Sequence, residues 1–335
     1  MKCYFIAGLA GTGKTAVAVG LAALLRGRGE VVGYRKVYGD TFPPGRPDPD
    51  AVLMKDWLGL PEPVEQLRLF RESPYYLDGP PNAAEADLPA LPYTSLILEG
   101  GTALERLRAV ELDLPHLARR WEAAVILVGR ARDDLELDRL LLWSDHLHLS
   151  GCRLLGTILN QVPTPLLERV DDRYRAVLEQ AGSPLLGVIP QQTDLVLPTV
   201  REYLEVSGAQ VVAGAASLDR PVEDVMIGAM SSDGALPYFR RMARKLVITG
   251  GDRADLAILA LETSTSGLLL TGGFKPALSV LTLATEKGIP VLLTGLDTMA
   301  TVERLHQVTP KLRCENREAI QRAEENLAKY CRIPL

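Results

Sequence analysis

The stretch Gly8-Leu9-Ala10-Gly11-Thr12-Gly13-Lys14-Thr15 decides the fold of this chain. It follows a short apolar run, Cys3 to Ala7, and precedes apolar residues at helical spacing from Ala16 to Leu25. A glycine-rich turn that joins a strand to a helix and closes with Lys-Thr matches the phosphate-binding pattern G-x-x-x-x-G-K-[ST] at every fixed position. A turn that only connected the two elements would not need the Lys-Thr pair. The sequence therefore predicts a nucleotide-binding loop here.

The chemistry of this loop follows from its residue types. Glycines allow backbone N–H groups to turn inward around a phosphate, and the start of the following helix adds its positive dipole end. Lys14 reaches the terminal phosphates, and Thr15 offers a hydroxyl to Mg²⁺. The loop residues that we expect to bind the nucleotide are Gly8, Gly11, Thr12, Gly13, Lys14 and Thr15.

Length and composition indicate an ordinary globular protein of two domains. The 335 residues exceed the usual size of a single core, and 47% of them are hydrophobic against 24% charged. The formal net charge of −5 and the lack of a long Lys/Arg cluster argue against a nucleic-acid partner. No segment approaches the ~20 uninterrupted apolar residues of a membrane helix, so we expect no membrane association.

The cysteines and histidines do not predict a metal site. Four cysteines lie far apart and form no C-x-x-C pair, which indicates neither a zinc site nor a disulfide framework and favours the reducing cytoplasm. His146 and His148 alternate as residues on one face of a strand would. Because no Cys or carboxylate stands near them at ligand spacing, we interpret both as packing or surface residues.

Charged side chains at element ends are the next candidates. One predicted strand leads to Lys36, and another ends at Glu99. Ligands of open α/β sheets collect at the carboxyl ends of strands, so Lys36 would face a ligand and Glu99 would organise a metal or a water. A solvated strand end and a helix N-cap are the alternatives. Asp48 or Asp50 either caps the helix expected over residues 50–58 or turns a carboxylate toward the metal.

Strands and helices alternate over residues 1–206, which we assign to the first domain. About six strands, each followed by a helix or loop, predict a mostly parallel α/β sheet, and one of these strands ends at Asn160. Residues 61–92 contain many prolines with weak periodicity, so we expect irregular structure there with a short helix near residues 83–88. Ser207-Gly208-Ala209 has the composition of a linker.

A smaller α/β domain is expected over residues 211–310. Three of its apolar runs end in Thr-Gly, each about one strand–helix unit after the last. Asp252 and Asp297 lie at the expected helix starts, where they either cap the helices or, with Arg253, line a crevice for an anion. Residues 311–335 contain an amphipathic helix that packs against a domain or a second subunit, and we expect a homodimer.

Together these motifs resemble a known pair of domains. The phosphate loop, Lys36, Leu98-Glu99-Gly100-Gly101 and Gly156-Thr157-Ile158-Leu159-Asn160 are similar to the dethiobiotin synthetase-like P-loop domain of the AAA_26 type. Thr249-Gly250-Gly251-Asp252-Arg253-Ala254-Asp255 resembles part of a DRTGG domain. This pairing occurs ahead of the catalytic domain in long phosphate acetyltransferases and also alone. No part of this sequence resembles the acetyltransferase catalytic domain.

The resemblance implies ATP and Mg²⁺ as cofactors. It places Asn160 beside the adenine, and it makes Lys14 and Lys36 contact phosphates or an activated carboxyl group. The implied metal group is Thr15, Glu99 and Asp50, with Asp48 as the alternative to Asp50. The implied catalytic residues are Lys14, Lys36 and Glu99.

Some family features are absent. The loop is one residue shorter than in typical dethiobiotin synthetases, and Leu9 stands where partitioning-type ATPases have a second lysine. Cobyrinate-type amide synthases use a glutaminase cysteine in a glycine-flanked elbow. Cys152 lies instead in Ser-Gly-Cys-Arg before a strand, so we do not expect amide transfer.

Two functions fit these residues. The first is a regulatory ATP-binding protein, or slow ATPase, whose second domain senses a small phosphorylated or nucleotide effector. The alternative is an ATP-dependent ligase that activates a small carboxylate through an acyl or carbamoyl phosphate. We favour the first because the second domain takes up over a third of the chain without a nucleophile–base pair.

Overall fold

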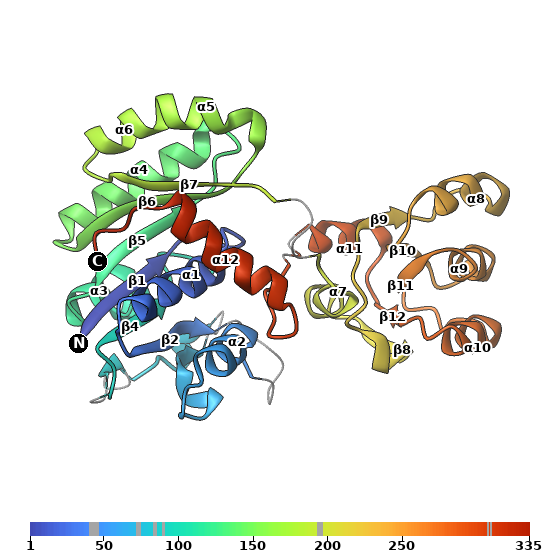
Figure 1. Cartoon of the computed structure of the whole chain (residues 1–335). Helices are drawn as coiled ribbons and strands as arrows, with labels where there is room; N and C mark the ends of the chain where they lie inside the picture. The colour runs from blue at the N-terminus through green and yellow to red at the C-terminus, as the bar shows by residue number, and fades with distance from the viewer. Residues whose placement is uncertain are drawn as a thin grey trace. The chain divides into compact units, whose positions relative to one another are not determined.

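The computed structural model describes residues 1–39, 47–71, 75–82, 86–88, 91–192, 197–306, 308 and 310–335. The chain divides into two compact units (Figure 1). The first comprises Met1–Leu195 together with Leu312–Leu335, and the second is Val196–Lys311. None of the helices in these ranges is long and apolar enough to cross a membrane. All four cysteines are free thiols.

The first unit is built on a seven-stranded parallel sheet, which confirms the predicted fold class. The strand order is β3-β2-β4-β1-β5-β6-β7. In that order the strands are Arg68–Arg71, Val32–Gly39, Ser95–Glu99, Lys2–Ala7, Ala124–Gly129, Arg153–Val162 and Leu185–Pro190. Strand β3 lies in the stretch that we expected to be irregular. The short helix expected near residues 83–88 falls largely outside the described residues.

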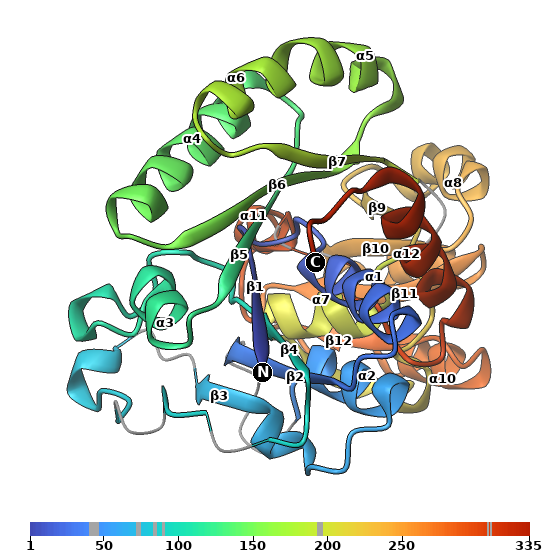
Figure 2. The same cartoon turned by 60° about the vertical axis from the view of Figure 1, so that its left-hand side comes forward.

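Helices cover both faces of this sheet. Helices α1 and α12 lie side by side on one face, and α3 and α4 lie on the other (Figures 1 and 2). At the end of α3, Trp121 contacts Phe5 of β1, with 6.0 Å between the ring centroids. The helices of this unit are α1 Lys14–Gly27, α2 Pro49–Leu58, α3 Leu114–Arg120, α4 Asp134–Leu149, α5 Leu167–Arg169, α6 Arg175–Gln180 and α12 Arg317–Tyr330. A π-helical turn, Val170–Tyr174, joins α5 to α6.

The assignment of His146 and His148 to a strand was wrong. Both lie on α4, which continues to Leu149. Its buried residues, Leu137, Leu140, Ser144 and Leu147, recur at helical rather than strand spacing. The two-residue alternation of the histidines is therefore a local coincidence within a helical pattern.

Helix α12 completes the first unit although it follows the second in sequence. It crosses α1 at Gly20, where an added Cβ would lie 2.5 Å from Cβ of Leu327, so glycine permits the close approach. Beyond the helix, Cys331 forms an antiparallel bridge with Gly187 of β7, and the Arg332 N–H donates to the Leu186 carbonyl at 2.7 Å. The predicted helix thus packs against a domain of its own chain.

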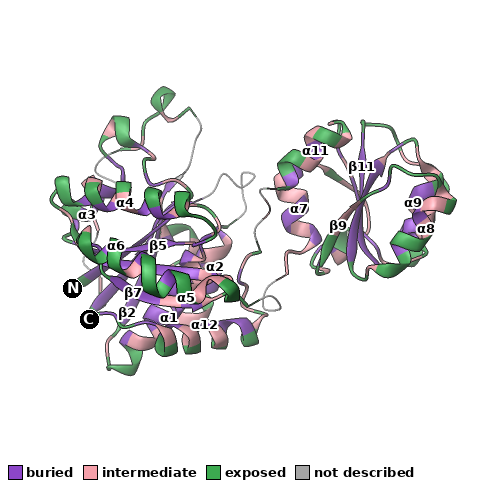
Figure 3. Cartoon of the chain, turned by 90° about the horizontal axis from the view of Figure 1, so that it is seen from above, coloured by how far each residue is buried: buried purple, intermediate pink, exposed green. Residues whose placement is uncertain are grey.

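The second unit is a five-stranded sheet between two helical layers (Figure 3). The order β8-β12-β11-β10-β9 is parallel except for β8, which runs antiparallel to β12. These strands are Gln210–Ala213, Val291–Leu293, Thr265–Thr271, Lys245–Gly250 and Asp224–Ile227. One face packs against α8 Ser232–Arg241, α9 Ala254–Leu261 and α10 Leu278–Glu286. The other face packs against α7 Val200–Ser207 and α11 Thr298–Leu305.

Helix α7 begins the second unit, whereas the sequence suggested a boundary after it. Val200 is fully buried and Tyr203 nearly so, and both belong to a hydrophobic cluster with Leu246 and Leu269 of this sheet. The start of the helix is fixed by a capping box, in which Glu202 accepts from the Thr199 N–H at 2.7 Å. The composition of the Ser-Gly-Ala stretch therefore marks a turn inside the second unit rather than a linker between units.

Candidate nucleotide and metal site

The phosphate loop connects β1 to α1 and requires its glycines for space and for backbone conformation. Gly13 has φ of 82°, in the left-handed region, and an added Cβ would lie 2.2 Å from Nδ2 of Asn160. A Cβ at Gly8 would lie 2.2 Å from the carbonyl oxygen of Val128. The loop thus packs against the ends of β5 and β6, and no side chain fits at Gly8 or Gly13.

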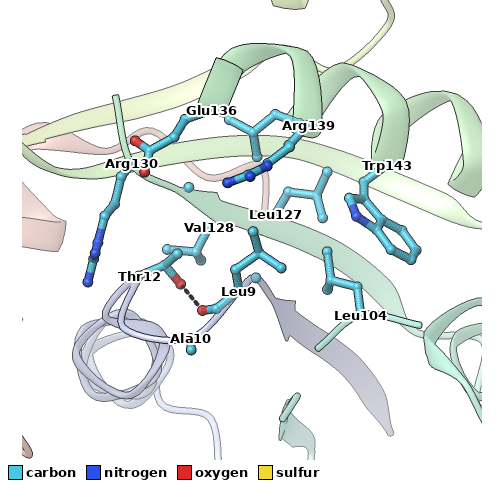
Figure 4. A pocket seen from close by; sticks show the side chains of 13 residues that line it. Leu9, Ala10, Thr12, Leu104, Leu127, Val128, Arg130, Glu136, Arg139 and Trp143 are labelled. Carbon is cyan, nitrogen blue, oxygen red and sulfur yellow. Dashed lines mark hydrogen bonds between the residues drawn. The ribbon is translucent and has the colours of Figure 1, made fainter. Parts of the chain in front are cut away.

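Side chains of the loop close it onto itself. The Lys14 ammonium is buried and donates to the carbonyl oxygens of Gly8 at 3.0 Å and Leu9 at 2.9 Å. The Thr12 hydroxyl donates to the same Leu9 carbonyl at 3.0 Å (Figure 4). The Lys14 ammonium thus lies against the loop itself.

The sheet register brings Lys36 and Glu99 together. They are paired residues on the adjacent parallel strands β2 and β4, so their side chains project from the same face. Lys36 Nζ lies 2.6 Å from Oε1 of Glu99 and 2.6 Å from Oδ2 of Asp50. The Thr15 hydroxyl donates to the same Glu99 oxygen at 2.9 Å. We refer to Thr15, Lys36, Asp50 and Glu99 as the carboxylate cluster.

Electrostatics keep Lys36 charged in this cluster. Burial disfavours the ammonium and lowers its pKa, but Asp50, Glu99 and Asp48 together raise it, and the net pKa lies well above the ordinary value. A cation therefore already occupies the position between the two carboxylates. Lys36 lies inside β2 rather than at its end, because the strand continues to Gly39.

Tyr34 is a member of the site that the sequence did not suggest. Its hydroxyl donates to Oε2 of Glu99 at 2.9 Å, so both oxygens of that carboxylate are engaged. Burial, followed by the charges of Glu99 and Asp50, raises the pKa of Tyr34 well above its usual value, so it remains a donor. Residues two apart on a strand share a face, and this spacing from Lys36 was the available signal.

The two candidate aspartates have different roles. Asp48 is the N-cap of α2, and its carboxylate accepts from the N–H groups of Asp50 at 3.0 Å and Ala51 at 3.1 Å. Asp50, in the first turn of α2, turns its carboxylate to Lys36 instead. Of the two alternatives, Asp50 is the one that the structure places in the carboxylate cluster.

The donor set of the carboxylate cluster fits Mg²⁺ better than a transition metal. It offers carboxylate oxygens from Glu99 and Asp50, each 2.6 Å from the Lys36 ammonium, and the hydroxyl of Thr15, which donates to Glu99. Across the described residues there is no group of three or more His, Cys, Asp or Glu side chains that could form a complete metal cage. Magnesium is usually held by one or two carboxylates, with phosphate and water as its remaining ligands.

Asn160 lies at the loop, from the carboxyl-terminal half of β6. Its Nδ2 donates to the Thr12 carbonyl oxygen at 2.9 Å, and the side chain is buried. An amide carries both a donor and an acceptor, so one side chain can hold the loop and still address a base edge.

We predict that Asn160→Ala lowers the preference for ATP over GTP, because a side-chain amide can distinguish the two base edges. Competition of the two nucleotides for the parent and variant chains measures this preference. If both affinities fall by the same factor, Asn160 acts through the Thr12 carbonyl alone and adenine is recognised elsewhere.

The three Thr-Gly strand ends of the second unit use most of their backbone donors internally. The Gly251 N–H donates to Thr271 at 3.0 Å, and those of Gly272 and Gly273 donate to Leu296 at 2.7 Å and Thr294 at 2.9 Å. These three N–H groups are therefore already engaged within the fold. An anion here would depend on side chains.

The charged residues at these strand ends differ in role. Asp297 caps α11, accepting from the Ala300 N–H at 2.8 Å, as expected. Asp252 is exposed and does not cap α9, because the helix begins one residue later and Arg253 holds the cap position. Arg253 forms a two-point ion pair with Asp255, with distances of 3.0 and 2.9 Å.

Comparison with known proteins agrees with this division. Residues 2–199 match the AAA_26 family, described as an AAA domain, and residues 202–308 match the DRTGG domain. Phosphate acetyltransferase of Nitrosomonas europaea is 25% identical over 72% of this chain and 37% of its own length. That of Pseudomonas putida is 27% identical over 98% of this chain and 50% of its own length.

A further relative has another name. Hydrogenobyrinate a,c-diamide synthase of Mycobacterium bovis is 31% identical over 56% of this chain and 39% of its own length. The chain thus spans half or less of the length of each of these three relatives. From its phosphate loop, its parallel sheet and the matched residues, the chain belongs to the AAA_26 family of P-loop AAA domains and carries a DRTGG domain after it.

Proposed function

We propose that this chain binds ATP with Mg²⁺ at the phosphate loop and acts as a nucleotide-dependent regulatory protein or slow ATPase. The carboxylate cluster is the observation that supports this proposal. Lys36 Nζ, a cation, lies 2.6 Å from each of two carboxylates, and Thr15 at the start of α1 donates to one of them. The cluster therefore stands beside the position where the terminal phosphates of a nucleotide would lie.

The oxygen atoms of the cluster could exchange one cation for another. The carboxylates of Asp50 and Glu99 already hold the Lys36 ammonium, and carboxylate oxygens are also ligands for Mg²⁺. Mg²⁺ would supply charge to the phosphate oxygens when bound, and Thr15, Glu99 and Asp50 are the residues that would hold it. Lys36, no longer needed between the carboxylates, would be free to neutralise a phosphate oxygen.

The ligase alternative is supported by a different observation. A buried lysine beside the phosphate loop could also hold a substrate carboxylate for activation, and one relative, 31% identical over 56% of this chain, is named as a diamide synthase. Cys152 does not have the surroundings of a glutaminase nucleophile. Its thiol contacts the Pro115 carbonyl oxygen, and burial raises its pKa, which disfavours the reactive thiolate.

Phosphate release measured with a panel of small acids distinguishes the two functions. We expect slow Mg²⁺-dependent hydrolysis of ATP that no acid stimulates strongly. Strong stimulation by one acid, with that acid consumed in proportion to ATP, would establish the ligase instead. If ATP does not bind the chain at all by calorimetry, both functions are wrong.

For the second unit we propose a small phosphorylated or nucleotide effector that Arg253 contacts. Its guanidinium is only partly exposed and is held by the exposed Asp255, which a phosphate could replace in the same two-point geometry. The effector would adjust the nucleotide state of the first unit, as expected of a regulatory protein.

Arg253→Ala should remove stabilisation by the effector. A panel of nucleotides, dinucleotides and acyl phosphates is tested for shifts in the melting temperature of the full chain. A ligand at a hundred times its dissociation constant adds about 2.7 kcal/mol, a shift of several degrees. Arg201→Ala is the matched control, because Arg201, which lies on α7, forms a similar two-point ion pair with Asp219, at 2.7 and 2.8 Å. If both variants lose the shift in melting temperature equally, or if no compound shifts the melting temperature of the parent chain, Arg253 does not form an effector site.

A further inference from the structure

A cavity lies against the phosphate loop on the β5 side of β1, whereas Lys36 and Glu99 of the carboxylate cluster lie on β2 and β4, on the other side of β1. Its volume is about 230 Å³. It is bounded by the loop, the end of β5 and the inner face of α4 (Figure 4). Gly8, Leu9, Ala10 and Thr12 form its wall on the loop side. An occupant of this cavity would therefore contact the loop directly.

The lining combines an apolar floor with a charged rim. The apolar side chains are Leu9, Ala10, Leu104, Leu127, Val128, Leu140 and Trp143. The charged side chains are Arg130, Glu136 and Arg139, so two guanidiniums stand against one carboxylate. A ligand with a short apolar body and one negative charge would balance this lining.

Both arginines have unused donors. In the part of the chain that the structure describes, Arg139 has no hydrogen-bond or ion-pair partner, and its side chain extends from α4 over the cavity (Figure 4). Arg130 donates through one terminal nitrogen to the Gly11 carbonyl oxygen. Its Nε is buried and has no partner among the described residues. A buried donor without an acceptor is unfavourable, and a ligand oxygen would relieve that cost.

The size of the cavity limits the ligand. Pockets for drug-sized molecules measure about 300–1,000 Å³, so this one holds a smaller molecule and not a whole nucleotide. Guanidinium groups match the two oxygens of a carboxylate in two-point geometry. The apolar floor would bury a short hydrocarbon chain or a single ring, with Trp143 along one side.

We propose that this cavity binds a small organic monocarboxylate with a short apolar body, held at its carboxylate by Arg139 and Arg130. Because Arg130 also donates to the Gly11 carbonyl, occupancy would be coupled to nucleotide binding in the loop, and the coupling would be reciprocal. The coupling rests on the proposed ATP site, whereas the binding itself does not.

Calorimetry on the full chain, without nucleotide, tests the binding. The ligands are butyrate, hexanoate and benzoate, with hexanamide as the uncharged match and inorganic phosphate as the anion without an apolar body. We expect at least one of the acids to bind, and hexanamide and phosphate to bind about tenfold or more weakly, the factor given by losing one charge-assisted hydrogen bond. Equal affinity for acid and amide, equal affinity for acid and phosphate, or no heat from any acid at millimolar concentration would overturn the proposal.

Three variants locate the binding. Arg139→Gln should weaken the best acid about tenfold or more. Arg173→Gln, an exposed arginine of the π-helical turn, should leave it unchanged. Trp143→Ala enlarges the cavity and should move the preference toward longer acids, which a purely structural role would not do. An unchanged affinity in Arg139→Gln, or the same loss in Arg173→Gln, contradicts the site.

Failure of this proposal can be told apart from failure of the proposed function. If the parent chain binds the acid but not ATP, the cavity stands and the nucleotide function fails. If it binds ATP and none of the acids, the proposed nucleotide site stands and the carboxylate cavity is wrong.

Discussion

Replacing Lys14 with alanine is expected to weaken ATP binding by about 100-fold or more. The ammonium of Lys14 is buried at the loop and donates to the neutral carbonyl oxygens of Gly8 and Leu9, which bind it less strongly than a phosphate would. Against a phosphate each charge-assisted hydrogen bond contributes about 1.5–3 kcal/mol, so losing one or two of them accounts for the expected factor. Calorimetric titration of parent and variant with ATP measures it.

Lys55 provides a matched control for this experiment. Its ammonium also donates to two carbonyl oxygens, those of Leu60 and Glu62, each at 2.7 Å, but at the end of α2 and away from the loop. Lys55→Ala should therefore lower stability about as much as Lys14→Ala and leave ATP affinity unchanged. Similar ATP affinity in the Lys14 variant and the parent would remove the basis for a nucleotide site.

Glu99→Gln is expected to reduce Mg²⁺-dependent hydrolysis by about 100-fold, the range found when a group that positions or stabilises reacting charge is lost. The substitution keeps an oxygen for Thr15 and Lys36 but removes the negative charge from the cluster. Affinity for ATP without metal should be retained, while the gain in affinity on adding Mg²⁺ should be lost. Phosphate release and titrations with and without Mg²⁺ measure the three quantities.

Glu62 is the matched control because its surroundings are similar. It accepts from Arg35 at 2.8 Å and from the Tyr93 hydroxyl at 2.7 Å, as Glu99 accepts from Lys36 and Tyr34. Burial raises the pKa of Glu62, but the Tyr93 and Arg35 hydrogen bonds lower it by more, so it is also an ionised carboxylate in a folded network. If Glu62→Gln and Glu99→Gln reduce hydrolysis equally, the Glu99 effect is structural.

Local motifs could be predicted from the sequence, whereas contacts between distant segments could not. The phosphate loop is contiguous, so residue types and spacing determine its conformation and the start of α1. Lys36 and Glu99 were both assigned to strands, but their contact depends on β2 lying next to β4 in register. Strand order is set by the packing of the whole sheet and leaves no mark within either strand.

Other features of the structure were not predicted from the sequence, each for its own reason. Tyr34 was overlooked because a tyrosine in an apolar run looks like core, although it shares a face with Lys36. The cavity beside Arg130 and Trp143 arises only when α4 packs on β5, and neither residue belongs to a motif. In the second unit, the strand-end amides bond to neighbouring turns that are remote in sequence, so the local Thr-Gly pattern could not reveal these bonds.

The position of α12 has a consequence for the order in which the protein matures. A chain emerges from the ribosome with its N-terminus first, so α12 emerges only after all of residues 196–311. Until then the groove of α1 at Gly20, which Leu327 fills in the finished fold, is exposed to water. The second unit is contiguous in sequence and has its whole core available first. Contrary to the usual N-terminal-first order, the second unit can therefore fold on the ribosome before the first unit is complete. Helix α1, which begins with Lys14 and Thr15, is then among the last parts of the protein to be fixed in place.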